Sequence, residues 1–413
     1  MIAPMHLWAL ATAAAVAAAC GLVGTLLVVR RMSLLGDAIG HAVLPGIAVA
    51  VLAGGRPGGL LVFAAATATA LLTVWLTRFL RTAVGLSEDA GAGVVFTALF
   101  AAGVVIVSTA GARMHLDPDC VLYGILEFVP FDTVVVAGSA VPRGFLAAAA
   151  VLAVVGCGLA ATWKLQAFAA FDAEAARAAG VPVAAVTGGL LAATALATVA
   201  GFEVVGAVLV VALLVVPAAA AELLFHRLHH VALAAVVIAV VGACLGYLAA
   251  WRWNTNAAGM IAVVLGLEYL AAVVLAPGDG LLARAASRLR YAWRVASEDR
   301  LAAVWRAGEQ GQAVPPPRTA LERVAAVWLA VTRRVVGGTT LSPVGRREAE
   351  MVVRSHRLWE AWLGRHADLP LDHLHPPAEW VEHHLGAAMR RRIEAEVGRV
   401  DGDPHGREIP PEA

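Results

Sequence analysis

Long apolar runs separated by short polar breaks fill the first two thirds of the chain. Each run is about 20 residues long, the length that an α-helix needs to cross the hydrocarbon core of a bilayer. The pattern predicts an all-α polytopic membrane region with about nine transmembrane helices. The runs fall at residues 6–29, 32–55, 59–77, 90–110, 144–163, 183–200, 203–222, 231–250 and 257–276. Between residues 121 and 140, Glu127, Pro130 and Asp132 break the pattern and indicate a re-entrant or interfacial segment.

Basic residues in the polar breaks predict the direction of the helices. Nine spans place the two ends of the membrane region on opposite sides, with seven basic residues on one side and four on the other. The excess favours the first side as the cytoplasmic one. The two sets are Arg30, Arg31, Arg78, Arg81, Lys164, Arg177 and Arg227 against Arg56, Arg113, Arg143 and Arg252. The N-terminus is therefore expected outside and the C-terminal part inside the cell.

Composition divides the chain into a membrane part and a soluble part. Of the 413 residues, 60% are hydrophobic and 15% charged, which excludes an ordinary soluble globular protein. Because the charged residues crowd into the last third, we expect a transmembrane domain at 1–278, a linker with a basic helix at 279–317, and a soluble, mostly α domain at 318–413. The four cysteines are single and far apart, which predicts no disulfide framework. The first apolar run has no basic segment before it and is expected to be a span, not a cleaved signal peptide.

Two ionisable residues, Asp37 and His41, lie inside the second apolar run. Four residues apart, they share one face of a helix. An ionisable residue in a membrane span is costly and marks a pathway or a site. A carboxylate beside an imidazole is half of a site for a divalent transition metal. The spacing alone fits equally well a polar pair that joins two helices.

The string that contains this pair, RRMSLLGDAIGHAVLPGIAVA, resembles the second-helix signature of the ABC-type permeases that import manganese, zinc or iron. The resemblance covers roughly residues 5–276 and includes the stretches 117–126, 168–180 and 205–223. It implies that Asp37 and His41 line the metal path. It also implies a multi-pass subunit in the bacterial cytoplasmic membrane. The implied partners are an ABC ATPase subunit and a metal-binding solute-binding lipoprotein.

A short amphipathic helix is predicted at residues 171–177, followed by a Gly-Val-Pro stop. On pattern alone this segment is an ordinary connecting helix. The resemblance implies that it is the coupling helix of the permease, which docks on the ATPase through Phe171, Asp172, Glu174 and Gly180. The sequence has no GxxxxGK[ST] motif for binding ATP. ATP hydrolysis is therefore expected on a separate subunit, and this chain is not expected to be an enzyme.

The soluble part shows its own pattern of elements. A basic helical stretch runs to about Ala307, and a break of three prolines follows at 315–317. Residues 335–341 predict a tight hairpin around Gly-Gly, because β-prone residues flank the pair. Ser342 followed by Pro343 predicts the start of a helix.

Residues suited to bind metals cluster after this helix start. A helix carries His356 and Glu360 at i and i+4, a loop carries His375, and one face of a further helix carries Glu379, Glu382 and His383 at i, i+3 and i+4. Imidazoles with carboxylates suit Mn, Fe or Zn at neutral pH. A solvated charged helix also contains such residues. Three segments that each carry spaced ligands favour a metal site.

The strings LSPVGRREAEMVVRSHRLWEAWL, HPPAEWVEHHL and DPHGREIP resemble the diphtheria-toxin-repressor and manganese-repressor family. The resemblance implies a metal-binding and dimerisation unit, a homodimer, and a bound divalent Mn, Fe or Zn ion. The residues to which it assigns metal-binding roles are His356, Glu360, His375, Glu379, Glu382, His383 and Asp299. Glu379 is typical of the manganese-sensing branch, but His375 is more like the iron branch. Ala302 stands where the manganese pattern has a second acidic ligand, so the preferred metal stays open.

The part of the repressor family that reads DNA is incomplete in this sequence. Between Gly311 and Ser342 the family has two helices, whereas this sequence predicts one, from Arg318 to about Thr332. We therefore expect a winged-helix remnant. Arg333 and Arg334 could touch phosphates, but a solvated helix end is the simpler interpretation.

Three functions fit these observations to different degrees. The favoured one is the permease subunit of an ABC importer for divalent metals, with a fused cytoplasmic metal-sensing domain. A membrane-tethered, metal-dependent transcriptional repressor is the alternative, and the missing recognition helix argues against it. A siderophore or cobalamin permease with a structural tail is the third, and Asp37 and His41 argue against it, because large organic substrates do not need them.

Overall fold

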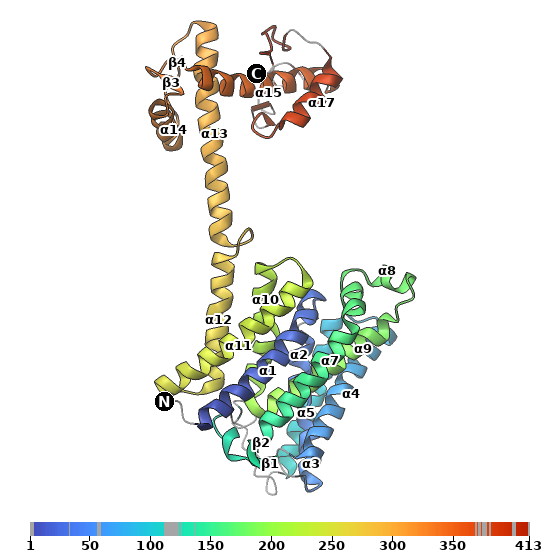
Figure 1. The fold of residues 1–413 in the computed structure, drawn as a ribbon. Coiled ribbons are helices and arrows are strands. Elements are labelled where there is room, and N and C mark those ends of the chain that lie inside the picture. The colour runs from blue at the N-terminus through green and yellow to red at the C-terminus, as the bar shows by residue number, and fades with distance from the viewer. Residues whose placement is uncertain are drawn as a thin grey trace. The chain divides into compact units, whose positions relative to one another are not determined.

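The computed structural model describes residues 4–32, 34–55, 59–110, 124, 126–136, 138–367, 370, 373, 378–379, 381–398 and 402–411. The chain divides into two compact units, Met1–Ala283 and Arg284–Ala413 (Figure 1). Each unit has its own apolar core.

The first unit is a bundle of apolar α-helices. In chain order they are α1 (Pro4–Val29), α2 (Leu34–Ala42), α3 (Leu44–Leu52), α4 (Leu60–Val84), α5 (Glu88–Ala110), α7 (Arg143–Phe171), α8 (Ala173–Ala178), α9 (Val183–Val205), α10 (Ala207–Leu224), α11 (Leu228–Trp253) and α12 (Ala257–Leu275). Among the described residues, eight helices are long and apolar enough to cross a membrane. These eight and the shorter α2–α3 pair occupy the nine predicted runs, and the predicted all-α polytopic fold is confirmed.

The second predicted span is two helices and not one. Helix α2 ends at Ala42, and α3 begins at Leu44 with Pro45 in its first turn. Proline has no backbone N–H, so Pro45 cannot donate the helical hydrogen bond to the carbonyl of His41. The prediction of one continuous run at 32–55 missed this break, which directly follows the Asp37–His41 pair.

The segment between α5 and α7 contains a small hairpin. Its described part holds η1 (Val129–Phe131) and the antiparallel strands β1 (Thr133–Val136) and β2 (Ser139–Pro142). The stretch 117–126 lies outside the described residues, except for Gly124 and Leu126. The hairpin and α8 lie at opposite ends of the bundle (Figure 1).

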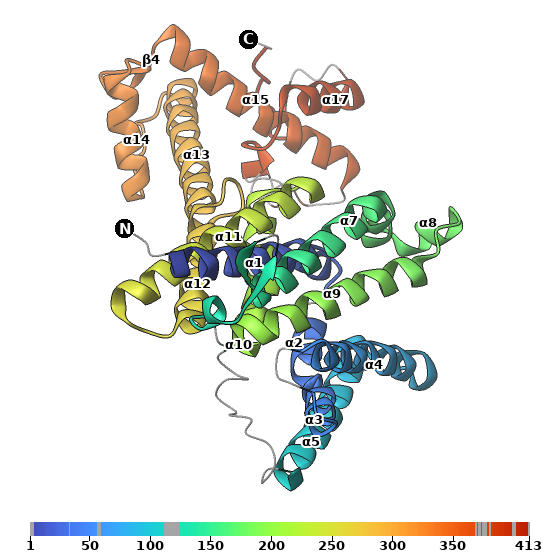
Figure 2. The same cartoon turned by 60° about the horizontal axis from the view of Figure 1, so that its bottom comes forward.

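Helix α1 is the centre of the bundle and packs against α7, α9, α10 and α11 (Figure 2). Small residues permit this packing. A Cβ atom added at Gly24 would lie 1.9 Å from the carbonyl oxygen of Leu214 on α10, and one at Gly21 would lie 3.0 Å from the carbonyl oxygen of Ala235 on α11. Close helix approach through glycine is a usual device in membranes, where lipid supplies no hydrophobic drive between helices.

Helices α2, α3, α4 and α5 pack together as a second group, which Figure 2 shows beside α9. Helix α2 contacts α4 and α5 in this group and also contacts α9 and α10. The helix that carries the Asp37–His41 pair therefore lies where the two groups of helices meet.

The second unit contains α13 (Leu281–Gln310, in this unit from Arg284), α14 (Ala320–Val331), the hairpin β3 (Val335–Val336) and β4 (Thr340–Leu341), α15 (Pro343–His366) and α17 (Ala387–Val397). The hairpin turns through Gly337 and Gly338, whose φ angles are +61° and +77°, as its Gly-Gly pair predicts. Ser342 caps α15 by accepting a hydrogen bond from the N–H of Gly345, as predicted. All residues from Gly311 to Ser342 are described, and they contain a single α-helix, α14.

We expect Gly24→Ala to destabilise the membrane unit. The added methyl group would force α1 and α10 apart, and overpacking of this kind costs about 1–3 kcal/mol. The thermal midpoint of the purified protein in detergent should therefore fall. The matched control is Gly189→Ala in α9, because a Cβ at Gly189 meets no atom within 4 Å, and its midpoint should not fall. Equal midpoints for the two variants would contradict the close approach of α1 and α10.

Candidate metal centres

The pair predicted to line the metal path lies in the last two turns of α2. The His41 ring is half-buried, and its centroid lies 5.6 Å from that of Phe96 and 5.9 Å from that of Phe100, both on α5. The backbone of Asp37 belongs to α2, but its side chain lies outside the described part of the structure. The helix break at Pro45 therefore follows an imidazole that is enclosed on one side by aromatic rings.

Close packing holds the other face of α2 against the central bundle. A Cβ at Gly36 would lie 2.9 Å from the Leu214 side chain on α10, and one at Gly40 would lie 3.8 Å from the Thr198 side chain on α9. Thr198 is buried, and its hydroxyl has no hydrogen-bond partner within the described part of the chain. Sequence reasoning missed Thr198, because a threonine in an apolar span carries no signal of its own.

Helix α8 forms the elbow between α7 and α9. Asp172 caps it, because its Oδ1 accepts hydrogen bonds from the N–H groups of Glu174 at 3.0 Å and Ala175 at 2.9 Å. Ala176 packs in an apolar cluster with residues of α7 and α9, while Phe171 and Glu174 are exposed. Gly180 follows the helix with a φ of +83°, which favours glycine. The predicted short helix is confirmed, except that Phe171 belongs to the end of α7.

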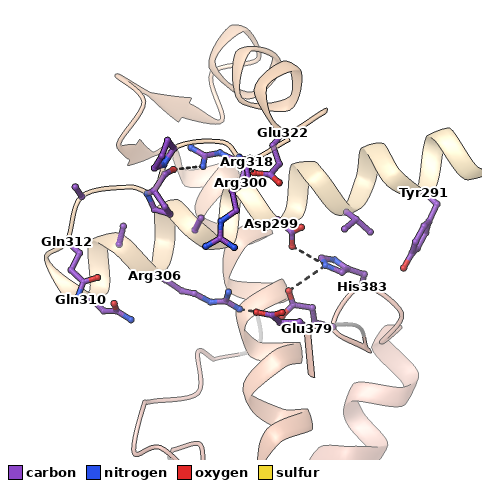
Figure 3. A pocket seen from close by; sticks show the side chains of 17 residues that line it. Tyr291, Asp299, Arg300, Arg306, Gln310, Gln312, Arg318, Glu322, Glu379 and His383 are labelled. Atoms are coloured by element: carbon purple, nitrogen blue, oxygen red, sulfur yellow. Dashed lines mark hydrogen bonds and ion pairs between the residues drawn. The ribbon is translucent and has the colours of Figure 1, made fainter. Parts of the chain in front are cut away.

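In the second unit, three candidate metal ligands, Asp299, Glu382 and His383, lie together. Asp299 and Glu382 are 83 residues apart in the sequence. Asp299 comes from α13, whereas Glu382 and His383 come from the turn that follows residue 381. One ligand atom from each of the three lies within 4.8 Å of the others (Figure 3). The His383 Nε2 atom lies 3.1 Å from Asp299 Oδ1 and 3.5 Å from Glu382 Oε1. The side chain of Asp299 is 46% exposed, so an ion can reach the group from solvent.

Further histidines and a glutamate extend this group into the interior of the second unit. The Nδ1 atom of His356 lies 2.7 Å from Glu382 Oε2, and its Nε2 atom lies 3.2 Å from Glu360 Oε1. His356 and Glu360 are both buried on α15. His405 reaches the same Glu360 oxygen at 4.0 Å. Carboxylates and imidazoles therefore alternate without interruption from Asp299 to His405.

Positive charge balances the buried carboxylates. Burial of the His383 ring disfavours its charged form, but hydrogen bonds to Asp299 and Glu298 and the charges of Asp299 and Glu382 outweigh this effect and raise the pKa of His383 to about 9. Burial also opposes charge on His356, and Glu360 and Glu382 still raise its pKa above the usual value. Because metal ligation needs a neutral imidazole, an ion bound here displaces protons.

Two neighbours of this group were not among the predicted residues. The Glu298 carboxylate lies 2.6 Å from His383 Nδ1 and orients the ring so that Nε2 faces Asp299. Arg306 lies 3.4 Å from Glu382 Oε2. Glu298 directly precedes Asp299, and Arg306 follows it by two helical turns on the same face of α13, but spacing within α13 does not reveal that His383 and Glu382 lie against this face.

The remaining predicted ligands stand apart from the three. Glu379 is exposed and precedes Glu382 by three residues. It lines a pocket of about 730 Å³ that Asp299, Glu382 and His383 also line (Figure 3). His375 lies outside the described residues. The predicted single helical face for Glu379, Glu382 and His383 ends early, because residues 382–384 form a turn.

Comparison with known proteins identifies both parts of the chain. Residues 342–411 match the iron dependent repressor, metal binding and dimerisation domain. The first part is similar to the manganese transport system membrane protein MntD of Bacillus subtilis, with 41% identity over 67% of this chain and 94% of the relative. It is also similar to the zinc transport system membrane protein TroD of Treponema pallidum, with 31% identity over 66% of this chain and 74% of the relative.

The fold of the first part agrees with a solved structure. That structure is PsaBC from Streptococcus pneumoniae in complex with Fab, and it matches with a TM-score of 0.57 and 25% identity over 67% of this chain and 93% of the solved chain. Residues 3–276 match the ABC 3 transport family. The chain therefore belongs to the ABC 3 transport family, with a domain like the metal-binding domain of iron-dependent repressors fused to its C-terminal side.

Proposed function

We propose that this chain is the permease subunit of an ATP-driven importer for divalent manganese, zinc or iron ions, with a fused metal-sensing domain. The observation that carries the proposal is α2, which brings an aspartate and a histidine to a helix break between the two groups of helices. Relatives that transport manganese and zinc support the same substrate class.

A broken helix suits the passage of an ion. Membrane transporters often place their substrate sites at discontinuous helices, where free backbone groups and side chains replace the water around the ion. In this chain Pro45 has no N–H to donate to the carbonyl of His41, so the helix is discontinuous directly after the Asp37–His41 pair. The ion is the cargo, and Asp37 and His41 supply a carboxylate and an imidazole along its path.

The partners follow from the two ends of the bundle. ATP hydrolysis is assigned to a separate ABC ATPase, which docks on α8 through Phe171, Asp172, Glu174 and Gly180. A metal-binding lipoprotein would deliver the ion at the opposite end, where Phe128 and Phe131 beside the hairpin are exposed. In this orientation, the N-terminus lies on the outer side of the bacterial cytoplasmic membrane and the segment after α12 lies on the cytoplasmic side.

The second unit is proposed to sense the imported ion in the cytoplasm. Asp299, Glu382 and His383 offer two carboxylates and an imidazole within ligand distance of one another, and His356 and Glu360 extend the set. Ligands of this kind without a thiolate suit Mn(II), Fe(II) or Zn(II) better than Cu(I). The domain is expected to pair as a homodimer.

Feedback is the regulation that this fusion suggests. If metal in the cytoplasm orders the second unit, the imported ion can restrain its own import. Such control requires a coupling free energy between the two sites and not fusion alone. DNA binding is the weaker alternative, because residues 311–342 contain one helix where a DNA-reading unit of this kind needs two.

We expect Asp37→Asn and His41→Gln each to abolish metal uptake while the protein stays in the membrane. Each variant keeps the size of its side chain but removes a ligand from the path. Uptake of radioactive manganese into cells, normalised to the amount of protein in the membrane, measures the effect. His6→Gln is the control, because His6 lies in the first turn of α1, where it pairs with Tyr247, and α2 follows the other end of α1. Wild-type uptake in both α2 variants would overturn the assignment of the path.

We expect Asp172→Arg with Glu174→Arg to uncouple ATP hydrolysis from transport, because the pair changes the charge of the α8 surface offered to the ATPase. Loss of the helix cap would mimic this effect. Asp172→Asn is therefore the control, since asparagine also caps helices. ATPase activity and transport are measured in the same proteoliposomes. Normal assembly and pumping by the double variant would show that α8 does not couple the two subunits.

We expect the second unit to bind Mn(II) or Fe(II) and to lose this binding in Glu382→Gln with His383→Gln. Changes around a metal ligand already cost about 10–100-fold in affinity, so the loss of two ligands should cost more than about 100-fold. Equilibrium dialysis is done on the whole chain carrying Asp37→Asn and His41→Gln. These two substitutions remove the proposed ligands on α2, so the metal bound reports on the second unit. Calorimetry on the fragment 285–413 repeats the comparison. His366→Gln, on the exposed end of α15, is the control. Unchanged binding in the double variant would remove the sensor.

A further inference from the structure

Arg30, directly after α1, joins three helices by hydrogen bonds. Its Nη2 group donates to the side-chain oxygen of Gln166 at 2.7 Å and to the carbonyl oxygen of Gln166 at 3.1 Å. Its Nη1 group donates to the hydroxyl of Thr187 at 3.1 Å. Gln166 belongs to α7 and Thr187 to α9, so one guanidinium group holds the ends of α1, α7 and α9 together.

Gln166 makes a further hydrogen bond within this group of residues, here called the Arg30 clamp (Arg30, Gln166, Thr187 and Val186). Its side chain is almost fully buried, and its Nε2 group donates to the carbonyl oxygen of Val186 on α9 at 2.9 Å. Both ends of the amide are therefore used, one by α1 and the other by α9. Hydrogen bonds from a charged donor are stronger than neutral ones, and a buried amide left without its partner is costly.

The clamp is built into the base of α8. Gln166 lies five residues before the end of α7, and Val186 lies in the first turn of α9. Val186 also packs in the apolar cluster that holds Ala176 of α8 against Ala169. A movement of α8 therefore moves the residues that hold Arg30.

Arg30 is also close along the chain to α2, the helix proposed to line the metal path. Only three residues separate Arg30 from the start of α2 at Leu34. Within this connection the N–H of Met32 donates to the carbonyl oxygen of Leu27 at 2.8 Å, and the Met32 side chain is buried. Because the connection is short and Met32 is held against α1, a displacement of Arg30 would reach α2, which carries Asp37 and His41.

We propose that Arg30 is a positioning residue that transmits the movement of α8, driven by the ATPase, to α2 and its metal-binding pair. The inference rests on the proposed function. Arg30 lies outside the pair, so its role is to set the position of α2 in each state of the transport cycle. A hydrogen-bond network couples two sites only when both sites change the equilibrium between its arrangements. The three hydrogen bonds of Arg30 to α7 and α9 supply that link.

The test measures manganese transported per ATP hydrolysed in proteoliposomes that contain the permease and its ATPase. We expect Arg30→Gln to assemble, to hydrolyse ATP, and to lower the ratio about tenfold, within the 5–150-fold range of typical coupling energies. The concentration of manganese that gives half-maximal transport should not change, because the ligands remain. Arg30→Lys, which can still donate to Gln166, should recover part of the ratio.

Lys164→Gln is the matched control. It removes one positive charge from the same end of α7, but Lys164 is exposed and two residues away from Gln166. Its ratio should equal that of the wild type. Thr187→Val, which removes one acceptor of Arg30, should lower the ratio less than Arg30→Gln, and the double variant should resemble Arg30→Gln alone, because both changes act through the same contact.

An unchanged ratio in Arg30→Gln would overturn the inference, and so would a proportional loss of ATP hydrolysis and transport. If Arg30→Gln does not accumulate, Thr187→Val decides the question, and a wild-type ratio in that variant overturns the inference. Failure of the proposed function is distinguishable, because in that case the wild-type complex itself would not transport manganese.

Discussion

Inside a bilayer, a polar group without a partner costs several kcal/mol, and this constraint accounts for most polar contacts of the membrane unit. Threonines of the spans meet it within their own helix. Thr25 donates to the carbonyl oxygen of Gly21 at 2.9 Å, and Thr73 donates to that of Thr69 at 2.9 Å. Other polar side chains reach a neighbouring helix, as Arg30 does with Gln166 and Thr187, and as His6 does with Tyr247.

The same constraint acts differently in the second unit, where buried carboxylates need positive charge. Glu382 receives it from Arg306 and from the two imidazoles of His356 and His383. A divalent ion bound here would supply the same positive charge. An ion bound among these ligands would displace protons from the two imidazoles.

Much of the fold could be predicted from the sequence, because the thickness of the bilayer sets the length of each apolar run. The break between α2 and α3 was missed, although Pro45 was visible, because hydropathy does not report backbone hydrogen bonds. The group of Asp299 with Glu382 and His383 depends on the packing of α13 against a distant turn. Spacing within one segment reveals ligands on one helix face, but it cannot reveal which face another segment covers. For that reason Asp299 came only from the family resemblance, and Glu298 and Arg306 were missed.

The two proposed metal sites use the same ligand types in different arrangements, and the difference fits their roles. A transport site must release its ion in every cycle, so few protein ligands on a movable helix suit it, as on α2. A sensor must hold its ion long enough to affect the protein, so a larger set fixed on packed elements suits it. The second unit has this arrangement, with Glu382 bound between His356 and His383 and with Glu298 orienting the His383 ring. Fusion of the two in one chain keeps the sensor at the membrane where the ion would enter. The local concentration of the ion, and not only its average level in the cell, would then set the occupancy of the sensor.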